Sequence, residues 1–191
     1  KKIASYVVEY IKDGCCLQLG IGGMPGQIGK ILADSDLKDL GVYTEMMCDS
    51  FMEMFEKGRI TGAKKGVDRF KMTFTFAMGT QKLYDWMDYN QMCASYPSDI
   101  CNYPPRIAMN DNMRCINNAV EVDLYGQVSS ESSGFRQISG TGGQLDFTIG
   151  AAMSRGGKSF ICLSSTTTDK DGNRVSRIVP YLKHGTIITV P

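Results

Sequence analysis

The stretch "GVYTEMMCDS" places the carboxylate of Glu45 between apolar neighbours, with Val42 and Tyr43 before it and Met46 and Met47 after it. An ionised side chain in such surroundings is costly unless something satisfies it. Poor solvation also removes the hydration that blunts a carboxylate as a nucleophile. The competing interpretation is structural, with the glutamate capping the next helix or pairing with a lysine. The residue types therefore make Glu45 a candidate nucleophile.

Two glycine-rich loops accompany this carboxylate, each where a predicted strand passes into a predicted helix. They are "LGIGGMPG" and "SGTGGQLDF", the latter at residues 139–147. The first departs from the GxGxxG spacing at Pro25 and has no Lys-Ser/Thr pair of a Walker loop, so by itself it is as consistent with a tight turn as with a ligand site. Two such loops indicate a site built from backbone N–H groups, which can hold an anion where parallel strands end. The glycines concerned are Gly20, Gly22, Gly23, Gly140, Gly142 and Gly143.

Other candidates for acid–base chemistry are few. His184 is the single histidine and reads as a surface loop residue, which leaves little room for a Ser-His-Asp or Cys-His arrangement. Glu121 and Asp123 alternate along a predicted strand, so both side chains can point the same way. They fit either a solvated strand edge before a turn or a paired acid and base of the glycosidase kind.

The elements that must position these residues alternate between strand and helix. Predicted helices cover residues 1–12, 27–34, 51–58, 80–90 and 145–153, with Pro25 near the start of the second and Asp49 or Ser50 capping the third. Predicted strands cover residues 15–21, 40–47, 69–79, 92–96, 113–124, 158–164, 174–180 and 186–190. This order predicts an α/β fold with an open, largely parallel sheet and flanking helices, in one unit over residues 1–191.

Composition excludes several classes of protein. The 191 residues carry a formal net charge of +1 with Lys and Arg scattered, which argues against binding to nucleic acid or a membrane surface. No apolar run reaches the length of a membrane span, and no signal-peptide pattern opens the chain. Seven cysteines without a CxxC pair indicate reduced thiols in a cytoplasmic protein, and no metal site is expected because zinc ligand spacing is missing. The start without Met and the apolar end predict a segment of a longer protein.

Five stretches together resemble the family I coenzyme A transferases, in the branch of the 4-hydroxybutyrate and butyryl-CoA:acetate CoA-transferases. The stretches, in the family's order, are "LQLGIGGMP", "LGVYTEMMCD", "NNAVEVDLYGQVSSE", "SGTGGQLDF" and "SSTTTDKDGNRVSRIVP". The resemblance implies a NagB/RpiA/CoA-transferase-like fold. It also implies that this chain is most of the second, C-terminal domain of a two-domain enzyme that forms dimers or larger homo-oligomers.

The resemblance assigns roles to individual residues. Glu45 matches the family's covalent nucleophile, and Ile21 and Gly143 match positions whose backbone N–H groups form an oxyanion hole. Asn102 in "ICNYPP" matches an asparagine near the reacting acyl group, while the other loop glycines would contact coenzyme A or the acid. Glu121 and Asp123 fall in a family segment and are interpreted as structural.

These assignments predict an exchange of coenzyme A between short-chain carboxylic acids, such as butyryl-CoA or 4-hydroxybutyryl-CoA with acetate, through a glutamyl-CoA thioester on Glu45. Coenzyme A is then a substrate, and no cofactor is needed. Two alternatives stay open: an acyl-CoA hydrolase that uses the same glutamate, and a non-catalytic nucleotide-binding domain whose glycine loops grip phosphates.

Overall fold

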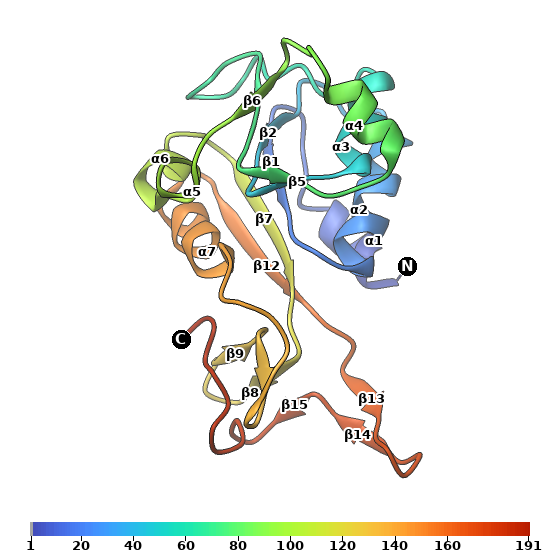
Figure 1. Ribbon diagram of the computed structural model, residues 1–191, viewed down its shortest axis with the longest axis vertical. Helices are drawn as coiled ribbons and strands as arrows, with labels where there is room; N and C mark the ends of the chain where they lie inside the picture. The colour runs from blue at the N-terminus through green and yellow to red at the C-terminus, as the bar shows by residue number, and fades with distance from the viewer. Residues whose placement is uncertain (1) are drawn as a thin grey trace.

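A parallel sheet forms the centre of the computed structural model, which describes residues 2–191 (Figure 1). Its six strands lie in the order β12-β7-β1-β2-β4-β6, and every neighbouring pair is parallel. The strands are β1 (Cys16–Leu19), β2 (Gly41–Tyr43), β4 (Met72–Phe74), β6 (Cys93–Ser95), β7 (Met113–Asn118) and β12 (Lys158–Cys162). The predicted α/β class with a largely parallel sheet is confirmed.

The strand order reverses direction beside β1. From β1 the chain proceeds through β2 and β4 to the edge strand β6, and then returns to place β7 and β12 on the other side of β1. In the register, Cys16 lies opposite both Gly41 and Met113. Connections that leave β1 and β7 toward opposite faces open a crevice at the carboxyl ends of these strands, where α/β sheets bind ligands.

Helices cover both faces of the sheet, with α1 to α4 on one side and α5 to α7 on the other (Figure 1). The first group is α1 (Lys2–Val8), α2 (Gly23–Ala33), α3 (Asp49–Glu56) and α4 (Gln81–Met87). The second group is α5 (Ser98–Cys101), α6 (Pro104–Ala108) and α7 (Gln144–Met153).

Alternation along the strands divides the buried residues into two cores. In β1, Leu17 and Leu19 face the core shared with α1 to α3, whereas Cys16 faces the core that includes Phe147 and Ala151 of α7. This alternation follows from the period of two along a strand. Both faces of the sheet are apolar because both are covered, as expected of a parallel sheet.

Short strands outside the main sheet form the remaining part of the chain. Beyond the ends of β7 and β12, Figure 1 shows them extending away from the helices. They are β8 (Glu121–Asp123), β9 (Val128–Ser129), β10 (Ser132–Ser133), β11 (Arg136–Gln137), β13 (Thr166–Thr168), β14 (Arg174–Ser176) and β15 (Ile178–Val179). A separate parallel pair, β3 (Met46–Met47) with β5 (Phe76–Ala77), continues β2 and β4 after a break.

Several expectations about the elements were wrong in detail. The predicted strand at 40–47 is interrupted at Thr44 and Glu45, because the Thr75 and Phe76 N–H groups both donate to the Glu45 carbonyl. The predicted cap of α3 is also wrong, since Cys48 is the N-cap residue and Asp49 instead accepts from the Thr80 N–H. Residues 186–190 form no strand but only an isolated bridge between Val128 and Val190.

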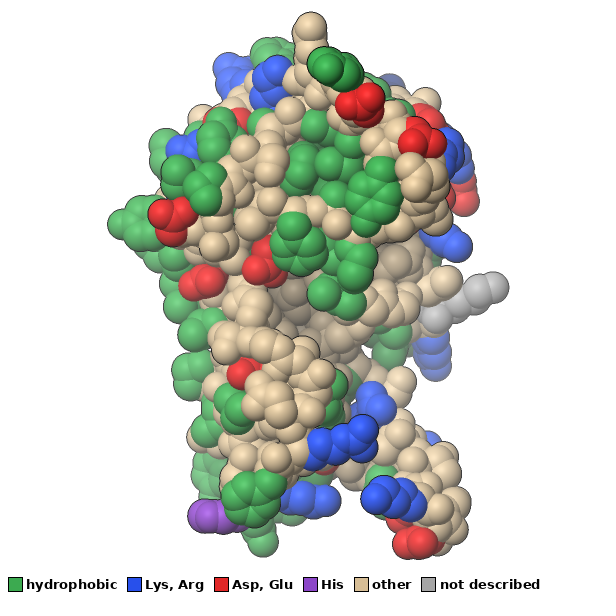
Figure 2. Space-filling view, viewed as in Figure 1, with side chains coloured by type: hydrophobic (Ala, Val, Ile, Leu, Met, Phe, Trp, Pro, Cys, Tyr) green, Lys and Arg blue, Asp and Glu red, His purple; other side chains and the backbone are tan. Residues whose placement is uncertain are grey.

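Charge and thiol chemistry agree with the composition. Lys and Arg side chains are spread over the face shown in Figure 2 rather than gathered into one patch. All seven cysteines are free, and five of them are buried. Among residues 2–191, no helix is both long and apolar enough to cross a membrane. Within the same residues, no three His, Cys, Asp or Glu side chains come together as metal ligands would.

Candidate active site

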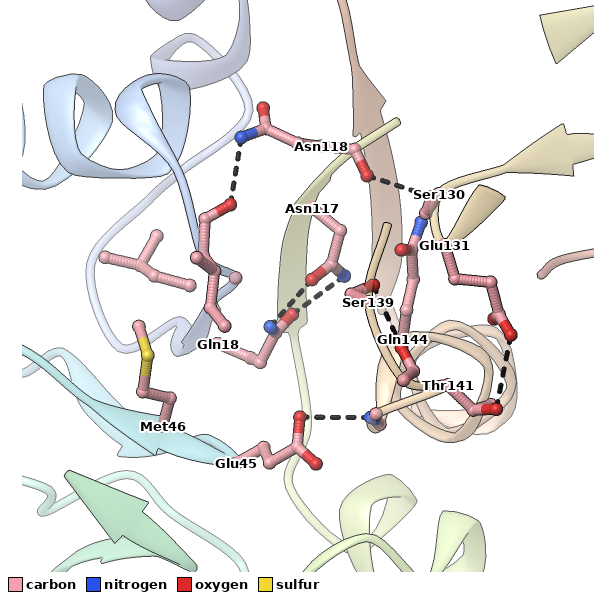
Figure 3. Close-up of a pocket in the computed structure, with 16 residues that line it drawn as sticks. Gln18, Glu45, Met46, Asn117, Asn118, Ser130, Glu131, Ser139, Thr141 and Gln144 are labelled. Atoms are coloured by element: carbon pink, nitrogen blue, oxygen red, sulfur yellow. Dashed lines mark hydrogen bonds between the residues drawn. The ribbon is translucent and has the colours of Figure 1, made fainter. Parts of the chain in front are cut away.

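A cavity of about 430 Å³ lies at the carboxyl ends of β1, β2 and β7 (Figure 3). It therefore occupies the crevice at which the strand order reverses. Glu45 lines it directly after β2, and Asn117 and Asn118 line it at the end of β7. The second glycine loop, residues 139–143, closes it ahead of α7.

The carboxylate of Glu45 is half-buried and held by one neutral donor on each oxygen. Asn102 Nδ2 donates to Oε1 at 2.9 Å, and the Gly143 N–H donates to Oε2 at 3.0 Å. Asn102 follows α5, and Gly143 immediately precedes α7, so two helices fix these donors. The glutamate thus holds one orientation, with its charge directed at an amide and a peptide N–H.

Gly143 is a site where only glycine fits without movement. A Cβ there would lie 2.6 Å from Asn102 Nδ2 and 3.0 Å from the Glu45 carboxyl carbon. Its own backbone has φ −93° and ψ 9°, which any residue can adopt. The requirement for glycine is therefore the close approach of the carboxylate rather than backbone conformation.

The first glycine loop, residues 20–23, supplies the opposite wall. Gly20 and Ile21 line the cavity with Glu45, and the Ile21 side chain is 60% exposed. Gly22 has φ 122° and lines a neighbouring hollow together with Gly20. A Cβ on Gly23 would meet nothing within 4 Å. The structure thus brings Ile21 and Gly143 to one cavity, whereas Gly22 and Gly23 do not line it.

In the second loop the predicted glycines all line the cavity. Gly140 and Gly142 join Gly143 there, and Gly142 has φ 57°, in the left-handed region. A Cβ on Gly142 would lie 3.7 Å from Glu45 Oε2, in ordinary contact, while one on Gly140 would meet nothing within 4 Å. The loop therefore approaches Glu45 most closely at its last glycine.

The electrostatics of the cavity depend on neutral donors. None of the residues that line it in the described chain is Lys or Arg. Asp146, in the first turn of α7, is a nearby carboxyl whose pKa is raised by burial and further by the charge of Glu45. Peptide and amide N–H groups can stabilise charge that develops on an oxygen without neutralising the carboxylate itself.

Sequence reasoning missed a polar group on the floor and side of the cavity. Gln18 and Asn117 exchange two amide hydrogen bonds, of 3.0 and 3.1 Å, across β1 and β7. Ser130, Glu131 and Thr141 line it as well. Asn117 and Asn118 could have been predicted from the sequence, because they end the long strand that lies beside β1. Ser130 and Glu131 arrive through a hairpin that the sequence did not predict.

None of the three other candidates for acid–base chemistry lines the Glu45 cavity. Asp123 is 6% exposed, and its Oδ1 accepts from the Tyr125 and Gln127 N–H groups at 3.0 Å, so it anchors a turn rather than lying on a solvated edge. Glu121 precedes it on β8, outside the residues that line the Glu45 cavity. His184 is exposed and packs against Phe135.

These observations define a class: an α/β domain whose switch-point cavity presents one carboxylate to backbone and amide donors. Residues 79–191 match the acetyl-CoA hydrolase/transferase C-terminal domain family. The chain belongs to this family, as its motifs predicted.

Named relatives cover nearly all of the chain. The butyryl-CoA:acetate CoA-transferase of Anaerostipes caccae is 56% identical over 99% of this chain and 42% of its own length. Two solved structures are similar. RipA from Yersinia pestis has a TM-score of 0.89 and 38% identity, and the match covers 99% of this chain and 41% of RipA. A 4-hydroxybutyrate CoA-transferase from Porphyromonas gingivalis has a TM-score of 0.81 and 40% identity, and the match covers 97% of this chain and 43% of that protein. The chain spans about two fifths of the length of these relatives.

Proposed function

We propose that this chain carries the nucleophile and the oxyanion donors of a CoA-transferase that exchanges coenzyme A between short-chain carboxylic acids. The observation that carries the proposal is the carboxylate of Glu45, held in the cavity by Asn102 Nδ2 at 2.9 Å and the Gly143 N–H at 3.0 Å. The names of the relatives support butyryl-CoA or 4-hydroxybutyryl-CoA, with acetate, as the substrates to test first.

The proposed reaction begins when a Glu45 oxygen attacks the thioester carbonyl carbon of the acyl-CoA. The C–S bond breaks, which releases the CoA thiolate and leaves a mixed anhydride between Glu45 and the acyl group. The thiolate then attacks the glutamyl carbonyl carbon and expels the first acid as its carboxylate. Glu45 now carries coenzyme A as a thioester, and an incoming carboxylate reverses the two steps.

Each step passes through a tetrahedral carbon that bears a negative oxygen. When the Glu45 carbonyl is attacked, the Gly143 N–H that now bonds Oε2 is in position to donate to that oxygen. Ile21 lines the same cavity and would supply a second N–H. In each step of the proposed reaction the nucleophile is already an anion, either a carboxylate or the CoA thiolate. The reaction therefore needs no histidine base.

The complete enzyme would contain more than this chain. We propose that the acyl-CoA and the acid bind between this domain and a further part corresponding to the remaining length of the relatives. A homo-oligomer, dimeric or larger, stays a prediction from the resemblance.

The test uses a protein of the relatives' full length that contains this chain, incubated with butyryl-CoA in the absence of an acceptor acid. A CoA adduct should form on the peptide that contains Glu45 and should be released by hydroxylamine. Glu45→Gln and Glu45→Ala should abolish both the adduct and CoA transfer. A Glu45→Ala protein that still transfers coenzyme A contradicts the proposal.

The same assay separates the alternatives. A hydrolase releases coenzyme A from butyryl-CoA at full rate without acetate, whereas a transferase needs the acceptor for turnover. A non-catalytic nucleotide-binding domain binds coenzyme A without any adduct, and its binding does not depend on Glu45.

A further inference from the structure

The segment between β7 and the second glycine loop has no part in the chemistry described above. It corresponds to the motif "NNAVEVDLYGQVSSE", in which Asp123 anchors a turn and Glu121 lies outside the residues that line the cavity. Because β8 and β9 pair antiparallel, the segment turns back on itself and brings its two ends together. The Ser130 hydroxyl donates to the Asn118 carbonyl at 3.1 Å, which joins these ends.

One end of the segment holds the first glycine loop. Asn118 Nδ2 donates to the Ile21 carbonyl at 2.9 Å and so spans from β7 to the loop after β1. A Cβ on Gly22 would lie 2.0 Å from this nitrogen. The absence of a side chain at Gly22 therefore admits the Asn118 amide, which then fixes Ile21, a residue that lines the cavity.

The other end holds the second glycine loop. The Glu131 carbonyl accepts from the Ile138 and Ser139 N–H groups at 2.8 and 3.2 Å. Its side chain is 4% exposed, and Oε1 accepts from the Thr141 hydroxyl at 3.3 Å. Oε2 is buried without a hydrogen-bond partner among residues 2–191. Burial of the Glu131 carboxyl with an unpaired oxygen is costly. This carboxyl contacts the second loop at Thr141, two residues before Gly143.

These contacts connect the two loops through one short path. Asn118, Ser130 and Glu131, which we term the loop clip, follow one another along one side of the cavity, and Glu45 lies across from Asn118 (Figure 3). We propose that the loop clip positions the two glycine loops relative to each other, and thereby sets the spacing of the Ile21 and Gly143 N–H groups around Glu45. This inference rests on the proposed function, and it makes the three residues positioning residues.

The loop clip predicts a specific pattern in rates. Displacement of a reacting group by about 1 Å can cost about 100-fold in rate. Asn118→Ala and Thr141→Val each remove the side-chain contact that holds one loop in place, so each should lower kcat about 10- to 100-fold at an unchanged KM for butyryl-CoA. The double variant should be little slower than the slower single variant, because the spacing is already free once either loop is released. Independent sites would instead multiply their effects.

The experiment measures the single-turnover rate of CoA adduct formation on Glu45 in the full-length protein, together with the urea midpoint of each variant. Glu131→Gln keeps the acceptor oxygen for Thr141 and should retain the wild-type rate within a few fold, whereas Glu131→Ala should be as slow as Thr141→Val. Thr141 is exposed, so we expect Thr141→Val to fold. Its rate can therefore be measured even if Glu131→Ala does not fold.

Two outcomes overturn the inference. One is a double variant of Asn118→Ala with Thr141→Val in which the losses multiply, and the other is a Glu131→Gln protein as slow as Glu131→Ala. Failure of the proposed function is a different result, because the wild-type protein then forms no adduct on Glu45 at all.

Discussion

Under the proposed function, Glu45 would act as a nucleophile without a cationic neighbour. Its two oxygens accept from a side-chain amide and a peptide N–H, and no Lys or Arg lines the cavity in the described part of the chain. An ammonium or guanidinium partner would form a strong ion pair with the carboxylate in its ground state. Neutral donors hold the carboxylate more weakly and, in the proposed reaction, would remain available for the oxyanion.

Gly143→Ala tests this arrangement at the residue scale. The added methyl group would lie 2.6 Å from Asn102 Nδ2 and 3.0 Å from the Glu45 carboxyl carbon, so one of the two side chains must move. We expect kcat for CoA transfer to fall about 100-fold, as for other misplaced or lost oxyanion donors. Steady-state assays of the full-length protein measure the change.

Gly26→Ala is the matched control for this prediction. A Cβ on Gly26 would meet nothing within 4 Å, and Gly26 lies on α2 outside the Glu45 cavity. The Gly26→Ala protein should keep the wild-type kcat. Equal rates for the two alanine variants would show that Gly143 does not need to be small.

At the scale of elements, the approach of α2 to α3 depends on another glycine. A Cβ on Gly29 would lie 2.4 Å from the Ser50 Cβ, which is fixed to the backbone of α3. The two helices can therefore pack as they do only because this position has no side chain. Since the loop before α2 contains Ile21 and the residues before α3 include Glu45, this contact also supports the cavity.

Alanine at Gly26 and alanine at Gly29, both in α2, should therefore change stability in opposite directions. Gly29→Ala should lower the free energy of unfolding by about 1–3 kcal/mol, because the helices must separate. Gly26→Ala should raise it by up to about 1 kcal/mol, because alanine is the better helix former and its methyl group is unobstructed. Urea unfolding of both variants measures the difference. A stabilised Gly29→Ala protein would mean that α3 moves without cost.

Sequence patterns identified the strands of the main sheet and the longer helices, and missed the short helices α5 and α6. The strand before "GIGGMPG" was found as a short, largely apolar run, and the helix after it follows the glycine-rich turn with Pro25 near its start. Helices α5 and α6 have four and five residues, interrupted by Asn102 and Tyr103, and are too short to show a period. Asn102 was therefore assigned by resemblance alone, although α5 is the element that positions it.

At the scale of the whole molecule, the cavity depends on contacts that no local pattern contains. The Asn118 to Ile21 contact joins residues 97 positions apart, and the Gly143 to Glu45 contact joins residues 98 apart. The rule that strands end at one edge of a parallel sheet predicted that the glycine loops and Glu45 would converge. It could not predict Ser130 and Glu131, because they reach the cavity through the small β8–β9 hairpin beyond that edge.

The cavity therefore lies between two parts of unequal local stability, and hydrogen exchange should distinguish them. All residues of β1 are buried between two helical layers, whereas β14 is exposed throughout and pairs only with β13. Local opening costs little where few apolar contacts must break. Peptides over residues 16–19 should exchange orders of magnitude more slowly than peptides over residues 166–176, with residues 118–131 between these extremes. Mass spectrometry of the exchanging protein tests this order, and uniform protection across the three regions would contradict it.

An intermediate rate at residues 118–131 would mean that the loop clip is less stable than the sheet. A bound acyl-CoA that holds both glycine loops, as in the proposed function, should then slow exchange at residues 118–131 more than in the sheet.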